Sequence, residues 1–267
     1  MNASPSISCR LCGGRARHRF TLQVMKRYQV GYYLCHECDS LQTEEPYWLK
    51  EAYQDQRRYY DTFTALRALY MSVRVSVLMR IFRLDRRHKI LDWGGGDGLG
   101  VRMMRDVGLD AYRSDRYAEN VYALGFDATP GRNYSVVTAS EVFEHFADPA
   151  TDLGDLFAGK PQLLLASTAR YRGQGEEWGY LFPLVGRHVF FYSEKAIRWI
   201  GNHYGYSVYS TPEYHVFSKQ PIRPWQKGLL RFMFSPRYFR LMLSAHALSS
   251  SLKYAVADRQ RMMEEYK

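Results

Sequence analysis

Residues 90–100, ILDWGGGDGLG, form an apolar run that ends in an acid and is followed by five glycines. A turn directly after a buried strand must tolerate positive φ and let a ligand approach the backbone, and glycine allows both. A helix starting at Gly98 would then point its free N–H groups toward an anionic group. The stretch predicts a strand, a ligand-binding turn and a helix, with a glycine-rich turn that binds no ligand as the alternative.

Apolar runs and helical patterns alternate after residue 88, which is typical of a parallel sheet with crossover helices. We expect an α/β fold with a Rossmann-like, seven-stranded, mostly parallel sheet over residues 88–218. Helices are expected at 98–107, from Asp148-Pro149 onward and from Ser193 to Gly205. The strands are expected at 88–93, 110–115, around Phe126, and at 134–140, 162–168, 207–210 and 214–218.

The spacing of the glycines distinguishes two kinds of cofactor. A nicotinamide or flavin site would need G-x-G-x-x-G, but its third glycine is replaced by Leu99 or Val101, depending on where the motif starts. An acid followed by glycines at alternate positions remains, over residues 92–98. Asp115, at the expected end of the next strand, could accept hydrogen bonds from both hydroxyls of a ribose.

Two segments resemble class I S-adenosylmethionine (SAM)-dependent methyltransferases. ILDWGGGDG resembles their first motif, and TASEVFEHFADP, residues 138–149, resembles the segment after their fourth strand. The resemblance covers roughly residues 88–218 and implies SAM as the cofactor, with adenine contacts near Phe126 and Asp127. It implies that Asp92, Gly94 and Gly96 hold the methionine end and that Asp115 binds the ribose. Gly98, Ser140 and Glu141 complete the expected set of cofactor-binding residues, with Ser140 and Glu141 bordering the cofactor.

The four cysteines of the chain form two close pairs, Cys9/Cys12 and Cys35/Cys38, separated by 22 residues. Two such turns can hold one Zn²⁺ in a closed tetrahedral site, which makes the metal structural. We therefore expect a small zinc ribbon-like module over residues 1–45, followed by linker helices over 46–87. Four reduced cysteines without a metal are the alternative.

The cysteine pairs before a methyltransferase domain resemble those of sugar methyltransferases with an N-terminal zinc-binding domain. Residues 27–53 resemble methyltransferases of bacterial polysaccharide biosynthesis, and GRHVFFYS, residues 186–193, resembles a segment of the sugar C-methyltransferases whose histidine lies near the reacting carbon. This implies His188 as general base, with helix capping at Ser193 as the alternative. Arg187 stands where that family has Glu, which favours O-methylation.

Other residues could also take part in the reaction. Glu144 and His145 could orient the substrate or act as base, or they could form a hydrogen-bond network at the start of a helix. Four aromatic residues could form a floor on which a sugar ring stacks, or they could be packing: Tyr171, Trp178, Tyr180 and Tyr192.

Residues 219–253 hold seven Lys or Arg and no Asp or Glu, and so account for most of the formal net charge of +10. Basic charge beside aromatic residues fits peripheral contact with an anionic membrane, and nucleic-acid binding fits the same residues. A helical extension with solvated arginines is the third interpretation. We expect a basic amphipathic extension over residues 219–267.

We expect a SAM-dependent O-methyltransferase that acts on a saccharide or glycan precursor, nucleotide-linked or lipid-linked. The alternatives are an RNA methyltransferase that holds nucleic acid with its zinc module and basic tail, and a non-catalytic SAM-binding scaffold. Nucleic acid is less favoured because the main domain lacks an Asn-Pro-Pro-Tyr-type motif and a catalytic cysteine. The sequence shows no secretory signal or apolar span, so we expect a cytoplasmic location, including the inner membrane surface.

Overall fold

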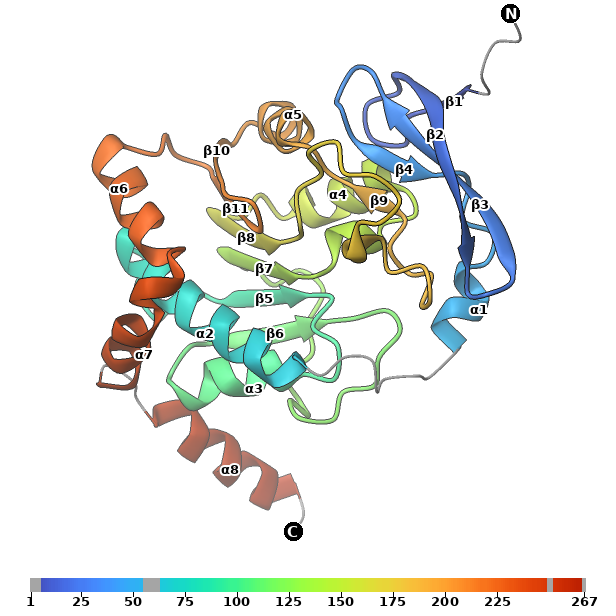
Figure 1. The fold of residues 1–267 in the computed structure, drawn as a ribbon. Coiled ribbons are helices and arrows are strands. Elements are labelled where there is room, and N and C mark those ends of the chain that lie inside the picture. Colours follow the sequence, from blue (N-terminus) through green and yellow to red (C-terminus); the bar gives the residue numbers. More distant parts are fainter. Residues whose placement is uncertain (1–5, 55–62, 249–251, 266–267) are drawn as a thin grey trace, which may run out of the picture. The chain divides into compact units, whose positions relative to one another are not determined.

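The computed structural model describes residues 6–54, 63–248 and 252–265, and Figure 1 shows the path of the chain. The chain divides into two compact units. The first comprises Met1–Tyr60, Glu141–Ala158 and Ala166–Phe217, and the second comprises Asp61–Ser140, Gly159–Leu165 and Ser218–Lys267. The first unit therefore groups the cysteine-bearing segment with residues more than a hundred positions later, which no local pattern in the sequence predicts.

The main sheet has six strands in the order β10-β11-β8-β7-β5-β6. β5 is parallel to both of its neighbours, β6 and β7. The predicted α/β fold with a mixed, mostly parallel sheet is thus confirmed. The strands are β5 (Ile90–Trp93), β6 (Ala111–Ser114), β7 (Val136–Ser140), β8 (Leu163–Ser167), β10 (Ser207–Ser210) and β11 (Tyr214–Ser218).

The strand expected around Phe126 is not formed, so the described residues give six strands where the sequence predicts seven. Only an isolated parallel bridge joins Arg113 to Asp127. Gly125 has a φ of +77°, which no extended run can accommodate, and the Phe126 N–H bonds the carbonyl of Ala123 in a turn. The backbone is extended for too few residues to continue the ladder.

Helices lie between the strands as the alternating pattern predicts. Ser193 caps its helix by accepting a hydrogen bond from Ala196 N at 2.9 Å, and Gly205 ends it at a φ of +73°. Two helices lie within residues 46–87, and residues 55–62 lie outside the described residues. The helices are α1 (Leu49–Gln54), α2 (Thr64–Ile81), α3 (Leu99–Asp106), α4 (Pro149–Ala158) and α5 (Glu194–Tyr204).

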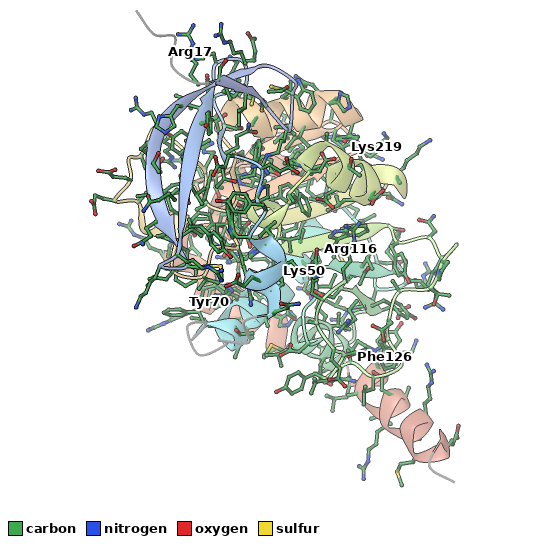
Figure 2. All side chains as sticks on the ribbon, turned by 90° about the vertical axis from the view of Figure 1, so that its right-hand side faces the viewer. Arg17, Lys50, Tyr70, Arg116, Phe126 and Lys219 are labelled. Atoms are coloured by element: carbon green, nitrogen blue, oxygen red, sulfur yellow. The ribbon has the colours of Figure 1, made fainter. Side chains whose placement is uncertain are left out.

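A second sheet carries the cysteines and is antiparallel, in the order β1-β2-β3-β4-β9. Its last strand comes from far along the chain, with Leu41 opposite Phe191. Trp48 packs into a hydrophobic core with Leu41 and Phe191 of this sheet and donates its indole N–H to the carbonyl of Gly186 at 2.8 Å. Arg17, in contrast, points away from β2 (Figure 2). The strands are β1 (Ser6–Ser8), β2 (Arg15–Val24), β3 (Tyr28–Cys35), β4 (Leu41–Thr43) and β9 (Phe190–Phe191).

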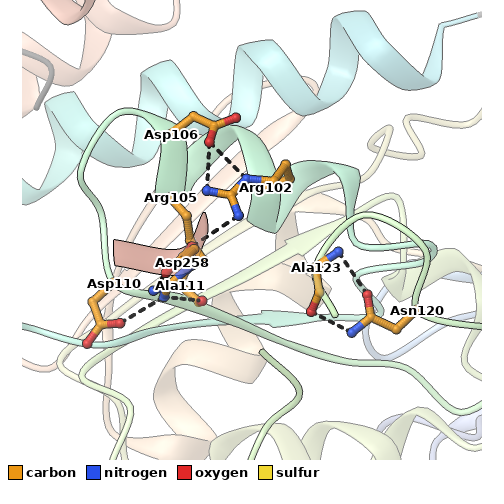
Figure 3. A network of polar contacts seen from close by, with 8 residues as sticks. All are labelled: Arg102, Arg105, Asp106, Asp110, Ala111, Asn120, Ala123 and Asp258. Carbon is orange, nitrogen blue, oxygen red and sulfur yellow. Dashed lines mark hydrogen bonds and ion pairs between the residues drawn. The ribbon is translucent and has the colours of Figure 1, made fainter. Parts of the chain in front are cut away.

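The C-terminal segment is helical. Its last helix, α8, is tied down by Asp258, which accepts hydrogen bonds from Arg102 and Arg105 of α3 at 2.7–3.0 Å (Figure 3). Phe126 lies beside α8 (Figure 2), where the guanidinium of Arg261 is 5.7 Å from its ring. Within residues 6–54, 63–248 and 252–265, no helix combines the length and the apolar character that crossing a bilayer requires. The elements are α6 (Pro224–Met233), the 3-10 turn η4 (Pro236–Tyr238), α7 (Phe239–Leu248) and α8 (Lys253–Glu265).

Candidate functional site

The glycine-rich turn between β5 and α3 takes the conformation that its sequence predicts. Gly94, Gly96 and Gly98 have φ values of 69°, 57° and 88°. A Cβ added at Gly98 would lie 2.8–3.0 Å from Asn120 and Ala123, so that glycine is required by packing. A Cβ added at Gly96 would meet nothing within 4 Å, so the backbone there borders open space. That space is where the turn can receive a ligand.

Asp92 ends the buried part of β5 and is only 6% exposed. Thr138 on the adjacent strand β7 donates a hydrogen bond of 2.7 Å to its Oδ1. Burial raises the pKa of Asp92 to about 6, although the bond from Thr138 opposes the rise and the charge of Asp115 adds to it. Asp92 therefore lies under the glycine turn as a group that changes charge near pH 6.

Asp115 follows β6 and holds three backbone N–H groups. Its Oδ2 accepts from Gly96 N at 3.0 Å, and its Oδ1 accepts from Tyr117 N and Ala118 N at 2.8 and 2.7 Å. A carboxylate has roughly four acceptor positions, so about one, on Oδ2, is left for a ligand hydroxyl. The predicted ribose contact through both hydroxyls would have to share this carboxylate with the turn.

Arg113 was not identified from the sequence, yet it braces the same turn. Its side chain is 5% exposed, and its guanidinium donates to the carbonyls of Gly96 and Ala118 at 2.5 and 2.9 Å. It also pairs with Asp127 at 3.0 Å. Asp127, for which the sequence predicts an adenine contact, thus pairs with the arginine that holds the glycine turn. Arginine in a β-strand has many uses, so no local signal pointed to this one.

Ser140 is the last residue of β7, and Glu141 follows it with a φ of 52°. The backbone N–H of Glu141 bonds the carbonyl of Ser167 at 3.0 Å, and the Ser167 hydroxyl donates to Glu141 Oε1 at 2.7 Å. β5 and β7 are parallel, so their carboxyl ends lie at the same edge of the sheet. The glycine turn after β5 and Glu141 after β7 therefore both start from the edge at which parallel sheets bind ligands.

Glu144, His145 and His188 form a cluster, which we call the acid–histidine cluster. One ligand atom from each lies within 4.8 Å of the others, and the two imidazole rings are 5.0 Å apart. The Tyr180 hydroxyl lies 2.7 Å from Glu144 Oε1 and 3.1 Å from Glu141 Oε2. The structure thus brings together the three residues for which the sequence predicted a catalytic role.

The tautomer of His188 follows from its neighbours. Its Nδ1 lies 2.6 Å from the carbonyl of Tyr180, which can only accept, so Nδ1 carries the proton and Nε2 is left with its lone pair. Helix capping by His188 is not seen, since Ser193 itself caps α5. His145 Nδ1 meets the Tyr53 hydroxyl at 3.3 Å.

Burial controls the charges in this cluster. It lowers the pKa of both histidines, and the charges of His188 and Arg187 lower that of His145 further. Burial and the neighbouring charge of Glu141 raise the pKa of Glu144 well above its ordinary value. Both histidines are therefore neutral near pH 7, and the raised pKa of Glu144 favours its protonated form. A neutral imidazole with a free Nε2 is the form that accepts a proton from a substrate.

The predicted aromatic floor is only partly available to a ligand. Tyr171 and Tyr192 are 3% and 0% exposed, so these two belong to the core, which corrects the prediction for them. Trp178 and Tyr180 are half-buried, with rings 5.3 Å apart, and Tyr180 lies 4.8 Å from the ring of His188. Aromatic side chains at irregular spacing pack as often as they bind, and of these four only Trp178 and Tyr180 remain accessible enough to meet a ligand.

The four cysteine sulfurs converge as the spacing predicts. Cys9 and Cys38 are 3.7 Å apart, and Cys12 and Cys35 are 3.6 Å apart, with all four within 4.8 Å. A tetrahedral Zn²⁺ site with Zn–S bonds of about 2.3 Å has sulfur–sulfur edges of roughly 3.8 Å, so these thiols fit zinc. The distances are far too long for disulfides, which need about 2.05 Å.

The cysteine cluster is connected to the rest of its unit by residues that the sequence did not single out. Arg10, between Cys9 and Cys12, donates to the carbonyls of Thr43, Ala147 and Val189 at 2.8–3.1 Å. Burial lowers its pKa to about 10. These carbonyls come from three separate segments, so the cysteine turns are built into the first unit rather than resting on residues 1–45 alone.

Comparisons with known proteins give the reaction class. A family model described as a methyltransferase domain matches residues 63–211, more than half of the chain. A comparison with the curated proteins found no match.

Several solved structures resemble this fold. One is CalO1, a methyltransferase in calicheamicin biosynthesis, in SAH-bound form, at 15% identity and a TM-score of 0.45 over 65% of this chain and 60% of that chain. Another is the mitomycin 7-O-methyltransferase MmcR, at 13% and 0.45 over 64% and 60%. A third is magnesium protoporphyrin IX methyltransferase from Synechocystis PCC 6803 with bound SAM, at 15% and 0.40 over 65% and 95%.

The chain spans about three fifths of the length of the first two of these structures, and the likeness concerns the fold. The family match covers the glycine turn, the segment after β7 and the acid–histidine cluster. The chain therefore belongs to the methyltransferase domain family.

Proposed function

We propose that this protein methylates a hydroxyl oxygen of a saccharide or glycan precursor, using SAM bound at the glycine turn. The observation that carries the cofactor part is the open space beside Gly96, whose positive φ leaves a bare backbone facing it. The N-terminus of α3 adds a positive dipole end, although its first N–H group, of Leu99, already donates to Asp97 Oδ1 at 3.2 Å. Asp92, Asp115, Ser140 and Glu141 are the acidic and hydroxyl side chains that we expect to contact the cofactor, together with Gly94, Gly96 and Gly98.

His188 is the residue that we propose as general base. When bound, SAM supplies an electrophilic methyl group on a sulfonium. His188 would accept the proton of the acceptor hydroxyl on Nε2, which is free because Nδ1 is held by the Tyr180 carbonyl. The acceptor oxygen would receive the methyl group, with S-adenosylhomocysteine, a neutral sulfide, as the other product. Glu144 and His145 would hold the acceptor and the imidazole in position.

The saccharide class rests on resemblance and on two side chains. Residues 27–53 and 186–193 resemble sugar methyltransferases. Half-buried Tyr180 lies beside His188, and half-buried Trp178 lies beside Tyr180; both offer ring faces with polar edges, as sugar-binding surfaces need. Arg187 takes the place of the Glu found in the C-methylating segment and donates to the Ala52 carbonyl at 3.0 Å. A carbon acceptor would need a second acid–base group, so oxygen is the simpler acceptor.

The test combines binding and turnover. Calorimetry should show SAM binding to the full chain, weakened about tenfold or more in Asp115→Asn, because the neutral amide cannot accept from Gly96 and a ribose hydroxyl as a carboxylate does. Release of S-adenosylhomocysteine should occur with nucleotide-linked or lipid-linked saccharides and not with RNA.

His188→Gln should lose turnover by a factor of about 10² or more while binding SAM normally. The exposed His203→Gln on α5 is the matched control and should retain both. SAM binding without turnover on any saccharide or RNA would mean a scaffold, and turnover on RNA would mean the second class of enzyme. Either result would overturn the proposal.

A further inference from the structure

One side of α6 buries its side chains and another exposes large apolar ones. Leu230 and Met233 are fully buried. Trp225, Leu229 and Phe232 are 45%, 45% and 36% exposed, and their spacing of four and three residues places them on one face of the helix. Such a stripe is costly in water unless something covers it.

The stripe continues into the next turn of the chain. The ring of Phe232 stacks on that of Tyr238 in η4, with centroids 3.9 Å apart and planes at 24°. Tyr238 is itself 42% exposed. Trp225, Leu229, Phe232 and Tyr238 thus form a continuous exposed surface, which we call the α6 face.

Cations without acidic partners accompany this face. Lys227 and Arg231 lie on the exposed side of α6, Arg237 lies in η4, and Arg240 follows in α7. None of the four forms an ion pair with a residue in the described part of the chain, and residues 219–253 contain no Asp or Glu. Some other cations of the same unit are paired, as Arg102 is with Asp106 and Asp258, whereas these four occur together in a stretch without acids. The unpaired charge therefore points to an anionic partner outside the chain.

We propose that the α6 face binds the surface of an anionic phospholipid membrane, with α6 lying in the plane of the interface. Trp225, Phe232 and Tyr238 would enter the boundary between headgroups and acyl chains, where aromatic rings with a polar edge are stable. Leu229, between them, has no use in base stacking but is well placed among acyl chains. Lys227 and Arg231 lie roughly 130–170° around the helix from the apolar stripe, so they would attract the anionic surface through its field rather than by packing on the apolar face.

This inference does not depend on the proposed methyl transfer, because no residue of the α6 face belongs to the glycine turn or the acid–histidine cluster. It bears on the acceptor, since an enzyme held at a membrane surface can reach lipid-linked glycans.

The experiment is sedimentation of the full chain with vesicles of phosphatidylcholine, with and without roughly one third phosphatidylglycerol. The protein should bind only the anionic vesicles, and raising the salt should weaken binding because surface charges are screened over about 10 Å. The triple variant Trp225→Ser, Leu229→Ser, Phe232→Ser should need about ten times more lipid, or still more, for half-maximal binding. Lys227→Gln with Arg231→Gln should weaken binding to anionic vesicles by a similar factor.

Val256→Ser with Met263→Ser is the matched control, since both side chains are more than half exposed on α8, outside the face. It should bind like the unaltered protein, and unchanged SAM binding by every variant shows that the fold is intact. Equal binding to neutral vesicles, no binding to either kind, or unaltered binding by the triple variant would overturn the proposal. The proposal would also be overturned if the unaltered protein bound RNA and the triple variant lost RNA binding but kept vesicle binding.

Discussion

The Thr138 hydroxyl on β7 donates a hydrogen bond of 2.7 Å to Oδ1 of Asp92 on β5, across the register that pairs these two residues. Burial raises the pKa of Asp92 to about 6, and this bond limits the rise. The acid under the glycine turn is therefore positioned by its neighbour strand, and its charge depends on pH.

Asp92 should make stability depend on pH in a defined direction. Because its folded pKa is about 6 and its ordinary value is 3.8, the folded chain keeps a proton that the unfolded chain loses as the pH rises through this interval. Relative to Asp92→Asn, the unaltered protein should lose about 3 kcal/mol of stability between pH 4 and about 6. Urea unfolding of both at several pH values tests this, and parallel curves would contradict it.

Two glycines of the turn should respond differently to alanine. Both have positive φ, which costs roughly 1–2 kcal/mol for a residue with a Cβ. Gly98→Ala would also drive its Cβ to 2.8 Å from Asn120 Oδ1, so it should destabilise the fold further. Gly96→Ala places its Cβ in open space and should mainly weaken SAM binding. Thermal unfolding measures the loss of stability, and calorimetry measures the loss of SAM affinity. If the two variants were equally stable and lost SAM affinity equally, the different roles given to Gly96 and Gly98 would be wrong.

Turnover should fall on the acidic side of its pH profile below pH 6.5. Burial lowers the pKa of His188 from its ordinary 6.5, so the imidazole accepts a proton as a neutral base until the pH drops below that value. The acidic limb of kcat/KM measures this directly once an acceptor is identified. A limb centred above pH 7 would exclude His188 as the base.

The chain should hold roughly one zinc ion, at the four cysteines, because their sulfur–sulfur distances fit a closed tetrahedral site. Cys12→Ser with Cys35→Ser should lose the metal and destabilise the first unit, since Arg10 and Ser193 connect the cysteine turns to its other segments. Elemental analysis of purified protein measures the content. His188→Gln should leave it unchanged, and a second ion lost in that variant would place a metal in the acid–histidine cluster instead.

Asp258→Asn should cost roughly 1.5–3 kcal/mol, because it removes one of the two carboxylates that pair with a buried guanidinium: the side chain of Arg105 is 4% exposed and keeps only Asp110 (Figure 3). Asp106→Asn is the matched control. Its carboxylate pairs with Arg102 but is half exposed, so its loss should cost less than about 1 kcal/mol. Denaturant unfolding gives both values, and equal costs would show that α8 is not anchored through Asp258.

Much of the fold could be predicted because its signals are local. The strand at residues 90–93, the glycine turn and the start of the helix after it are encoded in the eleven residues 90–100. The cap at Ser193 and the glycine at 205 likewise set the bounds of α5. The strand around Phe126 failed for a local reason too: Gly125 has no side chain to favour extension and takes positive φ.

The sequence by itself determined the glycine turn and the grouping of the cysteines, since each depends on residue spacing within a short segment. The reaction class was indicated by the resemblance of its motifs to methyltransferases. Only the tertiary structure decided which neighbours control them. Arg113 donates to the carbonyl of Gly96 in the turn, and the Tyr180 carbonyl fixes the tautomer of His188. Phe191 pairs with Leu41 and completes the cysteine-bearing sheet. None of these partners can be chosen from the sequence, because several other residues could make the same contact. Such contacts follow from the packing of the whole chain, and the residues that make them show no periodic sequence pattern from which they could be predicted.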